Sequence, residues 1–244
     1  MIGIVGGVGP LAGLNMASKI VEEVKAKTDQ EHIPFILSSQ PNRIVDRTDF
    51  LLGKMEINPA FAIAEIILEL DRAGATVVAI PCNTAHAPRI LDVVRDQLKI
   101  AQSSIKLLHI VEETVSFIKE HYGNIPVGVL STTGTKSEGL YRNVLIRQGL
   151  VPLEPTDSLQ REVHAAIYDN EFGIKANAVV VSEKARRIIL SAIQTLVSEG
   201  AKVVVLGCTE LPIAIPENEI NGVPLVDPNR VMARALIREV TINN

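Results

Sequence analysis

The stretch that decides the fold is Gly74-Ala75-Thr76-Val77-Val78-Ala79-Ile80-Pro81-Cys82-Asn83-Thr84-Ala85-His86. A helical pattern stops at Gly74, an apolar β-branched run follows over 76–80, and polar residues begin abruptly at Cys82. This order is typical of a buried parallel strand whose carboxyl end opens into a loop. Ligands of α/β proteins usually bind at such strand ends.

The same order returns near the end of the chain. The segment 200–210 reads G-A-K-V-V-V-L-G-C-T-E, and eight residues separate the glycine from the cysteine in both stretches. Cys82 and Cys208 are the two cysteines of the chain, and each has the same place in its own repeat. Because Val127–Leu130 also resembles the first strand, Ile2–Val5, we predict an internal duplication.

Short β-branched runs alternate with longer helical patterns, which indicates βα units and parallel sheets. We expect two similar α/β lobes related by a pseudo-twofold axis, with the active site in the cleft between them. The first lobe should cover 1–105, completed by a C-terminal helix at about 225–244, and the second 106–224. Further expected elements are strands at 35–39 and 106–109, a loop at 40–49, and helices at 11–27, 59–73, 112–121, 183–199 and 231–242.

Composition excludes several classes of protein. A chain of 244 residues with 47% apolar residues can bury one large core or two small ones. The net charge of −4 and the absence of a basic run predict no nucleic-acid partner. No apolar run approaches the ~20 residues of a membrane span. Two cysteines are too few for a disulfide framework, and the N-terminus enters a strand without a signal sequence, so we expect a cytoplasmic protein.

The paired cysteines suggest proton transfer. Each precedes a predicted helix, whose first N–H groups and dipole should lower the thiol pKa. Two thiols on opposite faces of a substrate, one ionised and one not, can remove a proton from one side and return it on the other. The alternative is that both are small buried hydrophobic residues. Cys82 and His86 could begin a metal site, but no second pair completes it, so we predict no metal.

Two further features point to an anionic ligand. Gly7, Gly9 and Ala12 match the dinucleotide pattern G-x-G-x-x-A, but Pro10 removes a helix-start amide and no acid ends the second strand. We therefore expect these glycines to let backbone approach a small anion. Arg47 could bind a carboxylate through two hydrogen bonds, although a solvated surface ion pair is the alternative.

Taken together, these motifs resemble the aspartate/glutamate racemase family, and most closely its cofactor-independent aspartate racemases. The resemblance implies two flavodoxin-like lobes, a homodimer, and racemisation without pyridoxal phosphate or metal. It rests on the segments Gly9–Ala12, Pro41–Thr48, Pro81–His86, Thr132–Thr135 and Gly207–Glu210. Gly13 departs from the family, which often has threonine there.

The resemblance also implies roles for individual residues. Cys82 and Cys208 would be the acid/base pair, and Arg47 and Lys175 would bind the substrate carboxylates. The remaining predicted substrate-binding residues are Gly9, Asn83, Thr84, Ala85, Thr132, Thr133 and Thr209.

We predict an amino-acid racemase that acts on aspartate, because two cations favour a dicarboxylate. Within the same family, a broad-specificity amino-acid racemase or a maleate-type isomerase is the alternative. From a different class, the chain could be a non-catalytic protein that binds a small ligand or a dinucleotide.

Overall fold

The computed structural model describes residues 1–177 and 180–242. Residues 178–179 of the predicted second lobe and 243–244 of the predicted C-terminal segment lie outside that description. The chain forms two compact units, one of Met1–Glu113 with the segment from Asn229 onward, and one of Thr114–Pro228. The helix α5 (Ile110–Tyr122) contains the boundary. No helix among the described residues has the length and apolar character needed to cross a membrane.

The first unit is built on a four-stranded parallel sheet with the order β2-β1-β3-β4. Ile2 at the start of the sheet's central strand β1 pairs with Phe35 on one side and Val77 on the other. The predicted strand at 106–109 is shorter than expected, since β4 ends at Leu107. The strands are β1 (Ile2–Gly6), β2 (Phe35–Ser39), β3 (Val77–Ala79) and β4 (Lys106–Leu107).

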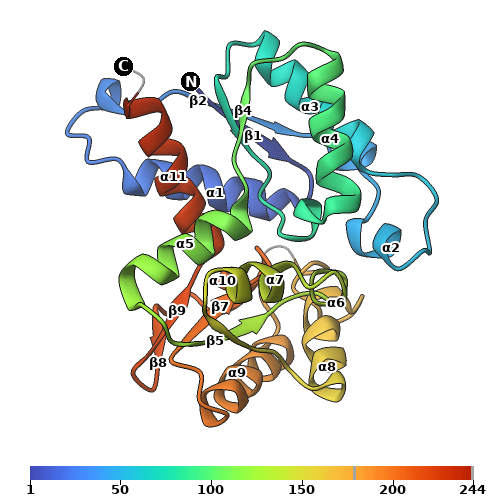
Figure 1. Ribbon diagram of the computed structural model, residues 1–244, viewed down its shortest axis with the longest axis vertical. Coiled ribbons are helices and arrows are strands. Elements are labelled where there is room, and N and C mark those ends of the chain that lie inside the picture. The colour runs from blue at the N-terminus through green and yellow to red at the C-terminus, as the bar shows by residue number, and fades with distance from the viewer. Residues whose placement is uncertain (178–179, 243–244) are drawn as a thin grey trace. The chain divides into compact units, whose positions relative to one another are not determined.

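Helices cover both faces of this sheet. Figure 1 shows α1 (Pro10–Glu23) and α11 (Pro228–Ile242) on one side, and α3 (Ala60–Arg72) and α4 (Pro88–Ile100) on the other. The apolar side of α3 is buried, with Ile63, Ile66, Ile67 and Leu70 among its buried residues, as expected for an amphipathic helix. α11 joins this unit through Arg230 and Arg234, whose guanidinium groups lie 2.5 and 2.7 Å from the carboxylate of Glu23 on α1.

The expected loop at 40–49 is instead partly helical. It contains a 3₁₀ turn at Pro41–Arg43, and the short helix α2 (Arg47–Leu51) begins within it. The carboxylate of Asp46 accepts a hydrogen bond from the backbone N–H of Asp49 at 3.0 Å, which caps α2. Two more 3₁₀ turns lie at Asp29–Glu31 and Thr84–His86.

The second unit repeats the topology of the first. Its sheet has the order β6-β5-β7-β9-β8, so its four parallel strands, β5, β6, β7 and β9, are arranged as β1 to β4 are. This order is that of flavodoxin-like doubly wound sheets, and it confirms the predicted duplication. The strands are β5 (Pro126–Leu130), β6 (Val151–Leu153), β7 (Val203–Leu206), β8 (Glu219–Ile220) and β9 (Val223–Val226).

The strands β6, β8 and β9 were not expected from the sequence. β8 runs antiparallel to β9, and Asn221 and Gly222 join them with φ angles of 51° and 76°. Two successive residues with positive φ are typical of the tight turn of a two-residue hairpin.

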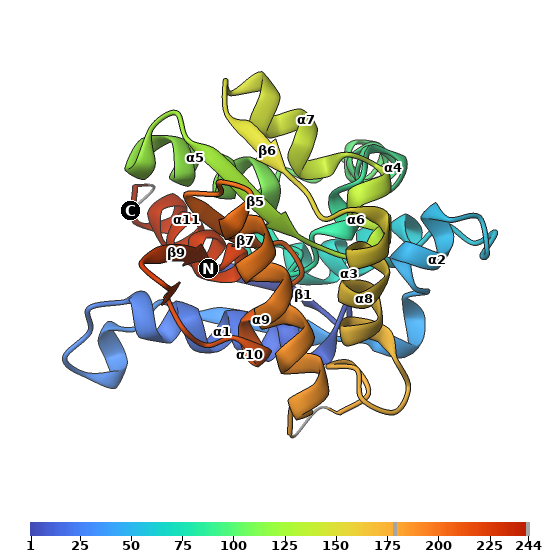
Figure 2. The same cartoon turned by 90° about the horizontal axis from the view of Figure 1, so that it is seen from below.

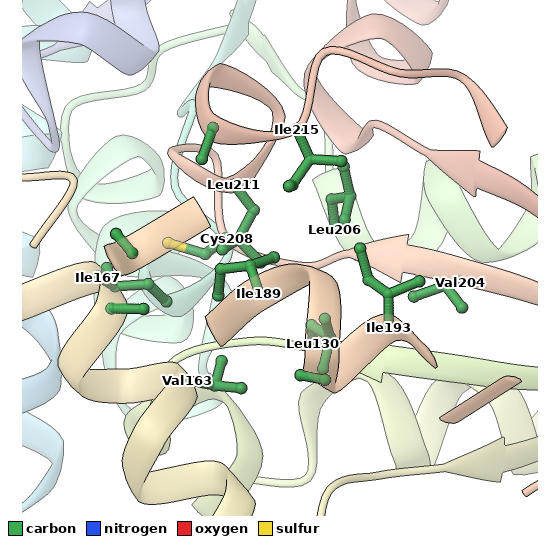
Figure 3. Packing of buried hydrophobic residues seen from close by; sticks show 14 of the residues in the cluster. Leu130, Val163, Ile167, Ile189, Ile193, Val204, Leu206, Cys208, Leu211 and Ile215 are labelled. Atoms are coloured by element: carbon green, nitrogen blue, oxygen red, sulfur yellow. The ribbon is translucent and has the colours of Figure 1, made fainter. Parts of the chain in front are cut away.

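Helices α8 (Asp157–Tyr168) and α9 (Glu183–Ser198) lie side by side in the second unit (Figure 2). Ser182 caps α9, as its sequence predicts, by accepting a hydrogen bond from Ala185 N–H at 3.1 Å. Residues of both helices form a core with β5 and β7 (Figure 3). The unit also contains α6 (Thr133–Ser137), α7 (Leu140–Arg147) and α10 (Leu211–Ala214).

Candidate active site

Cys82 lies three residues beyond the end of β3, where the loop turns into the 3₁₀ segment Thr84–His86. It is a free cysteine and is 7% exposed. The predicted helix after it does not begin at once, because α4 starts only at Pro88. Asn83, Thr84 and Ala85 are buried beside it.

His86 stabilises this loop. Its Nδ1 lies 2.9 Å from the carbonyl oxygen of Cys82, and its ring centroid is 4.7 Å from that of His109. Burial, and to a smaller extent the charge of His109, lowers the pKa of His86 to about 3. A neutral imidazole can donate from Nδ1 to the Cys82 carbonyl, so His86 acts as a packing and hydrogen-bonding residue. Among the described residues, no group of three or more His, Cys, Asp or Glu side chains could hold a metal ion.

Arg47 is not a solvated surface cation. It is the first residue of α2, is 6% exposed, and donates to the carbonyl oxygens of Val8 at 2.5 Å and Val45 at 3.3 Å. The loop of Val8 follows β1, so the guanidinium links the loops that follow two neighbouring strands. A Cβ on Gly7 would lie 2.6 Å from the backbone nitrogen of Pro41, which explains why the first loop carries glycine.

The glycine loop leads directly into α1. Gly9 precedes the helix with a φ of 146°, and Pro10 is its first residue. The departure from the family at Gly13 has a packing reason, because a Cβ there would lie 3.0 Å from Leu37 Cδ1 and 3.3 Å from Gly6 Cα.

Cys208 lies at the equivalent place in the second unit, two residues beyond β7. The intervening Gly207 allows a close approach, since a Cβ there would lie 2.9 Å from both the Leu130 carbonyl oxygen and a ring carbon of Tyr141. Cys208 is free and 6% exposed. Figure 3 shows its side chain among Ile167, Ile189 and Leu211 in the core of this unit.

A buried carboxylate contacts this thiol. Glu210, only 3% exposed, accepts hydrogen bonds at Oε2 from Cys208 Sγ (3.0 Å) and Thr209 Oγ1 (3.2 Å). Its other oxygen, Oε1, accepts a hydrogen bond from Lys175 Nζ at 2.5 Å. The sequence places Glu210 within the second cysteine motif, but no role was predicted for it. The sequence could have indicated a role for Glu210, because the second repeat has an acidic residue two positions after its cysteine, where the first repeat has a threonine.

These surroundings favour the neutral thiol. Burial raises the pKa of Cys208 well above its usual range, and the neighbouring negative charge of Glu210 raises it further, while Lys175 acts in the opposite direction. The expectation that a helix start would lower the pKa is therefore wrong at Cys208. The helix that follows, α10, has only four residues, and the Glu210 carboxylate lies 3.0 Å from the Cys208 sulfur.

Lys175 was predicted to bind a substrate carboxylate. In the structure, its ammonium is already paired with a carboxylate of the protein itself. The Lys175–Glu210 ion pair is largely buried, with side-chain exposures of 23% and 4%. The charge that Lys175 offers a substrate is thus compensated by Glu210.

Thr132 and Thr133 follow β5, the strand next to β7 in the sheet. Thr132 caps α6, because its hydroxyl accepts from Thr135 N–H at 3.3 Å. Thr133 N–H donates to His164 Nδ1 at 3.4 Å. The structure thus places Gly9, Arg47 and 82–85 in segments that follow strands of the first unit, and 132–133 and 208–209 in segments that follow strands of the second. Lys175 instead lies between α8 and α9 and is joined to the segment after β7 by its ion pair with Glu210.

The sequence and the fold are similar to those of known proteins along nearly the whole chain. Residues 5–236 match the Asp/Glu/hydantoin racemase family. The chain belongs to this family. Among solved structures, this racemase is similar to an aspartate racemase of Picrophilus torridus, with a TM-score of 0.80 and 26% identity over 98% of this chain and 94% of that one.

Two other relatives show the breadth of the family. The broad specificity amino-acid racemase RacX of Bacillus subtilis is 26% identical over 97% of this chain and 96% of its own length. The glutamate racemase of Francisella tularensis, at 17% identity, shares the fold with a TM-score of 0.71 over 99% of this chain and 81% of that one. The comparisons confirm the racemase family and the two-lobed α/β fold.

Proposed function

We propose that this racemase interconverts L- and D-aspartate without a cofactor and that Cys82 and Cys208 are its two acid/base residues. The observation that carries the proposal is the repeated placement of a buried free cysteine just beyond the third strand of each sheet. Similarity to an aspartate racemase supports the choice of substrate.

In the proposed reaction, one cysteine as thiolate takes the α-proton, and the electron pair of the broken C–H bond stays on the α-carbon. The other cysteine, as thiol, gives its proton to the opposite face. The α-carbon is inverted and the two sulfurs have exchanged protonation states, so no other reactant is needed. Because Cys208 donates a hydrogen bond to Glu210, we assign Cys208 as the thiol and Cys82 as the base of the resting enzyme.

The carbanion requires electrostatic stabilisation, since the α-hydrogen of an amino acid is a very weak acid. We propose that Arg47 and the backbone around 83–85 bind the α-carboxylate. Gly9, Thr132, Thr133 and Thr209 would orient the amino acid. Lys175 would bind the side-chain carboxylate of aspartate, with its charge moderated by Glu210.

A second candidate is racemisation of a broader set of amino acids. The Lys175–Glu210 ion pair favours it, because a compensated lysine discriminates less sharply for a second carboxylate than a lone one. Similarity to a broad specificity racemase agrees with this reading. The two candidates differ in one measurement, the ratio of kcat/KM for aspartate to that for alanine or lysine.

The deciding experiment is incubation of L-aspartate in deuterium oxide without added cofactor, followed by NMR and chiral chromatography. We expect deuterium at the α-carbon and formation of D-aspartate with the wild type, and loss of both with Cys82→Ser and with Cys208→Ser. Activity that survives both changes would mean that the thiols are structural. A cysteine–maleate adduct in mass spectrometry would instead identify an isomerase, and tight binding without turnover would identify a binding protein.

Two further properties belong to the proposal. Both thiols must stay reduced, which suits the cytoplasm. We also expect a homodimer, as the family resemblance implies, and sedimentation analysis of the full chain tests it.

A further inference from the structure

The helix α8 carries two stacked rings that contact residues of the proposed site. His164 and Tyr168 are one turn apart, so they lie on the same side of the helix. Their ring centroids are 4.7 Å apart, with an interplanar angle of 22°. His164 Nδ1 accepts a hydrogen bond from the backbone N–H of Thr133 at 3.4 Å. At the other end of the stack, the Lys175 ammonium lies 5.3 Å from the centroid of the Tyr168 ring. The stack therefore joins two segments that were predicted to bind substrate.

The turn after α8 explains how Lys175 reaches this ring. The backbone N–H of Gly173 donates to the Asp169 carbonyl oxygen at 2.9 Å, and a Cβ on Gly173 would collide with that oxygen. The turn therefore requires glycine. The N–H of Lys175 then donates to the carbonyl oxygen of Ile167 at 3.1 Å. These bonds fix the backbone of Lys175 against the last turn of α8, which ends at Tyr168.

Two partners restrain the Lys175 side chain, and they act differently. The Glu210 carboxylate accepts a hydrogen bond from Nζ at 2.5 Å and compensates the positive charge. The Tyr168 ring attracts a cation through its π electrons but carries no net charge, so it restrains the ammonium without compensating it further.

The orientation of the ion pair decides how it acts on an anion. The Lys175 side chain is 23% exposed and that of Glu210 only 4%, so the positive partner is the more accessible one. An anion is attracted to an ion pair when the positive end lies nearer to it. A group that fixes the position of the ammonium therefore sets the strength of that attraction.

We propose that Tyr168 is a positioning residue for the second carboxylate of the substrate. Its ring, stacked on His164, holds the Lys175 ammonium at the accessible end of the ion pair, so that the site prefers a dicarboxylate to a monocarboxylate. This inference rests on the proposed function, in which Lys175 binds the side-chain carboxylate of aspartate. It requires the ring of Tyr168 and not its hydroxyl group.

The test compares binding of succinate and propionate to the full-length protein by isothermal titration calorimetry. Succinate has the two carboxylates of aspartate without the amino group, and propionate has one carboxylate. We expect the wild type to bind succinate about tenfold more tightly than propionate. Tyr168→Leu should weaken succinate binding about threefold to tenfold and leave propionate binding unchanged. Tyr168→Phe keeps the ring and should bind succinate within about twofold of the wild type.

Three further variants locate the effect. Tyr122→Leu makes the same change on α5, where the ring packs against Phe117, and should bind succinate as the wild type does. Tyr168→Met fills more of the space than leucine but also lacks the ring, so it should show the same loss as Tyr168→Leu. In a Lys175→Met background, Tyr168→Leu should cause no further loss, because the two changes act through one contact.

Three outcomes would overturn the inference. They are equal losses in Tyr168→Phe and Tyr168→Leu, a further loss in the Lys175→Met background, and equal affinities of the wild type for succinate and propionate. Succinate cannot be racemised, so these measurements are separate from the racemase assay. Racemisation of aspartate without a preference for succinate would refute the inference and leave the proposed function standing. The expected succinate results without racemisation of aspartate would do the reverse.

Discussion

Replacing Glu210 by glutamine should lower the pKa of the Cys208 thiol. Glutamine keeps the size of the side chain but removes the negative charge that lies within hydrogen-bond distance of Sγ. Two unit charges about 4 Å apart interact by roughly 4 kcal/mol at an effective dielectric constant of about 20, so the Glu210 carboxylate strongly disfavours a thiolate at Cys208. Lys175 loses its partner in the variant and acts in the same direction. We expect the pKa of Cys208 to fall in the variant, while burial of the thiol continues to hold it above its usual range.

The assay is the pH dependence of thiolate ultraviolet absorbance and of iodoacetamide alkylation. Both are measured in a Cys82→Ser background, so that Cys208 is the only thiol. In the enzyme with both cysteines, the thiol form of Cys208 would be lost at lower pH. The basic limb of the kcat/KM profile for aspartate should therefore move to lower pH by a similar amount.

Glu219→Gln provides the matched control, because it removes one negative charge from an exposed position of the same unit. It should leave both profiles in place. The reasoning is refuted if Glu210→Gln leaves the titration of Cys208 where it is in the wild type, or raises its pKa, in a variant with a wild-type circular dichroism spectrum.

Three other predictions follow from the geometry. Gly207→Ala should lower the free energy of unfolding by about 1–3 kcal/mol in urea denaturation, because the new Cβ would lie 2.9 Å from the Leu130 carbonyl oxygen; an unchanged midpoint would contradict the close approach. His86 is neutral in the folded protein down to a pKa of about 3 but is protonated below about 6.5 when unfolded. As the pH is lowered from about 6.5 to about 3, the free energy of unfolding of the wild type relative to His86→Gln should therefore fall by about 1.4 kcal/mol per pH unit. A difference that does not change with pH would refute this prediction. Arg47→Lys should reduce kcat/KM for aspartate about tenfold or more, since a single ammonium cannot replace the planar fork that bonds the Val8 and Val45 carbonyl oxygens; retained activity would remove Arg47 from the proposed site.

Much of the fold was predictable because it depends on local signals. β-Branched runs specified the strands that flank each cysteine, and Ser182 marked the start of α9. The equal spacing of the two Gly-to-Cys stretches indicated the duplication, which the matching strand orders confirm. The boundary errors have local causes too, such as the Asp46 cap that begins a helix inside the expected loop.

The sequence by itself therefore determined the α/β architecture, the repeat and the position of each cysteine at a strand end. Only the tertiary structure decided what those groups contact. Glu210 and Lys175 are 35 residues apart, and Arg47 and Val8 are 39 residues apart, so no periodicity relates them. The direction of the Cys208 pKa is also a tertiary property, because it depends on the desolvation and charge that the folded core places around the sulfur.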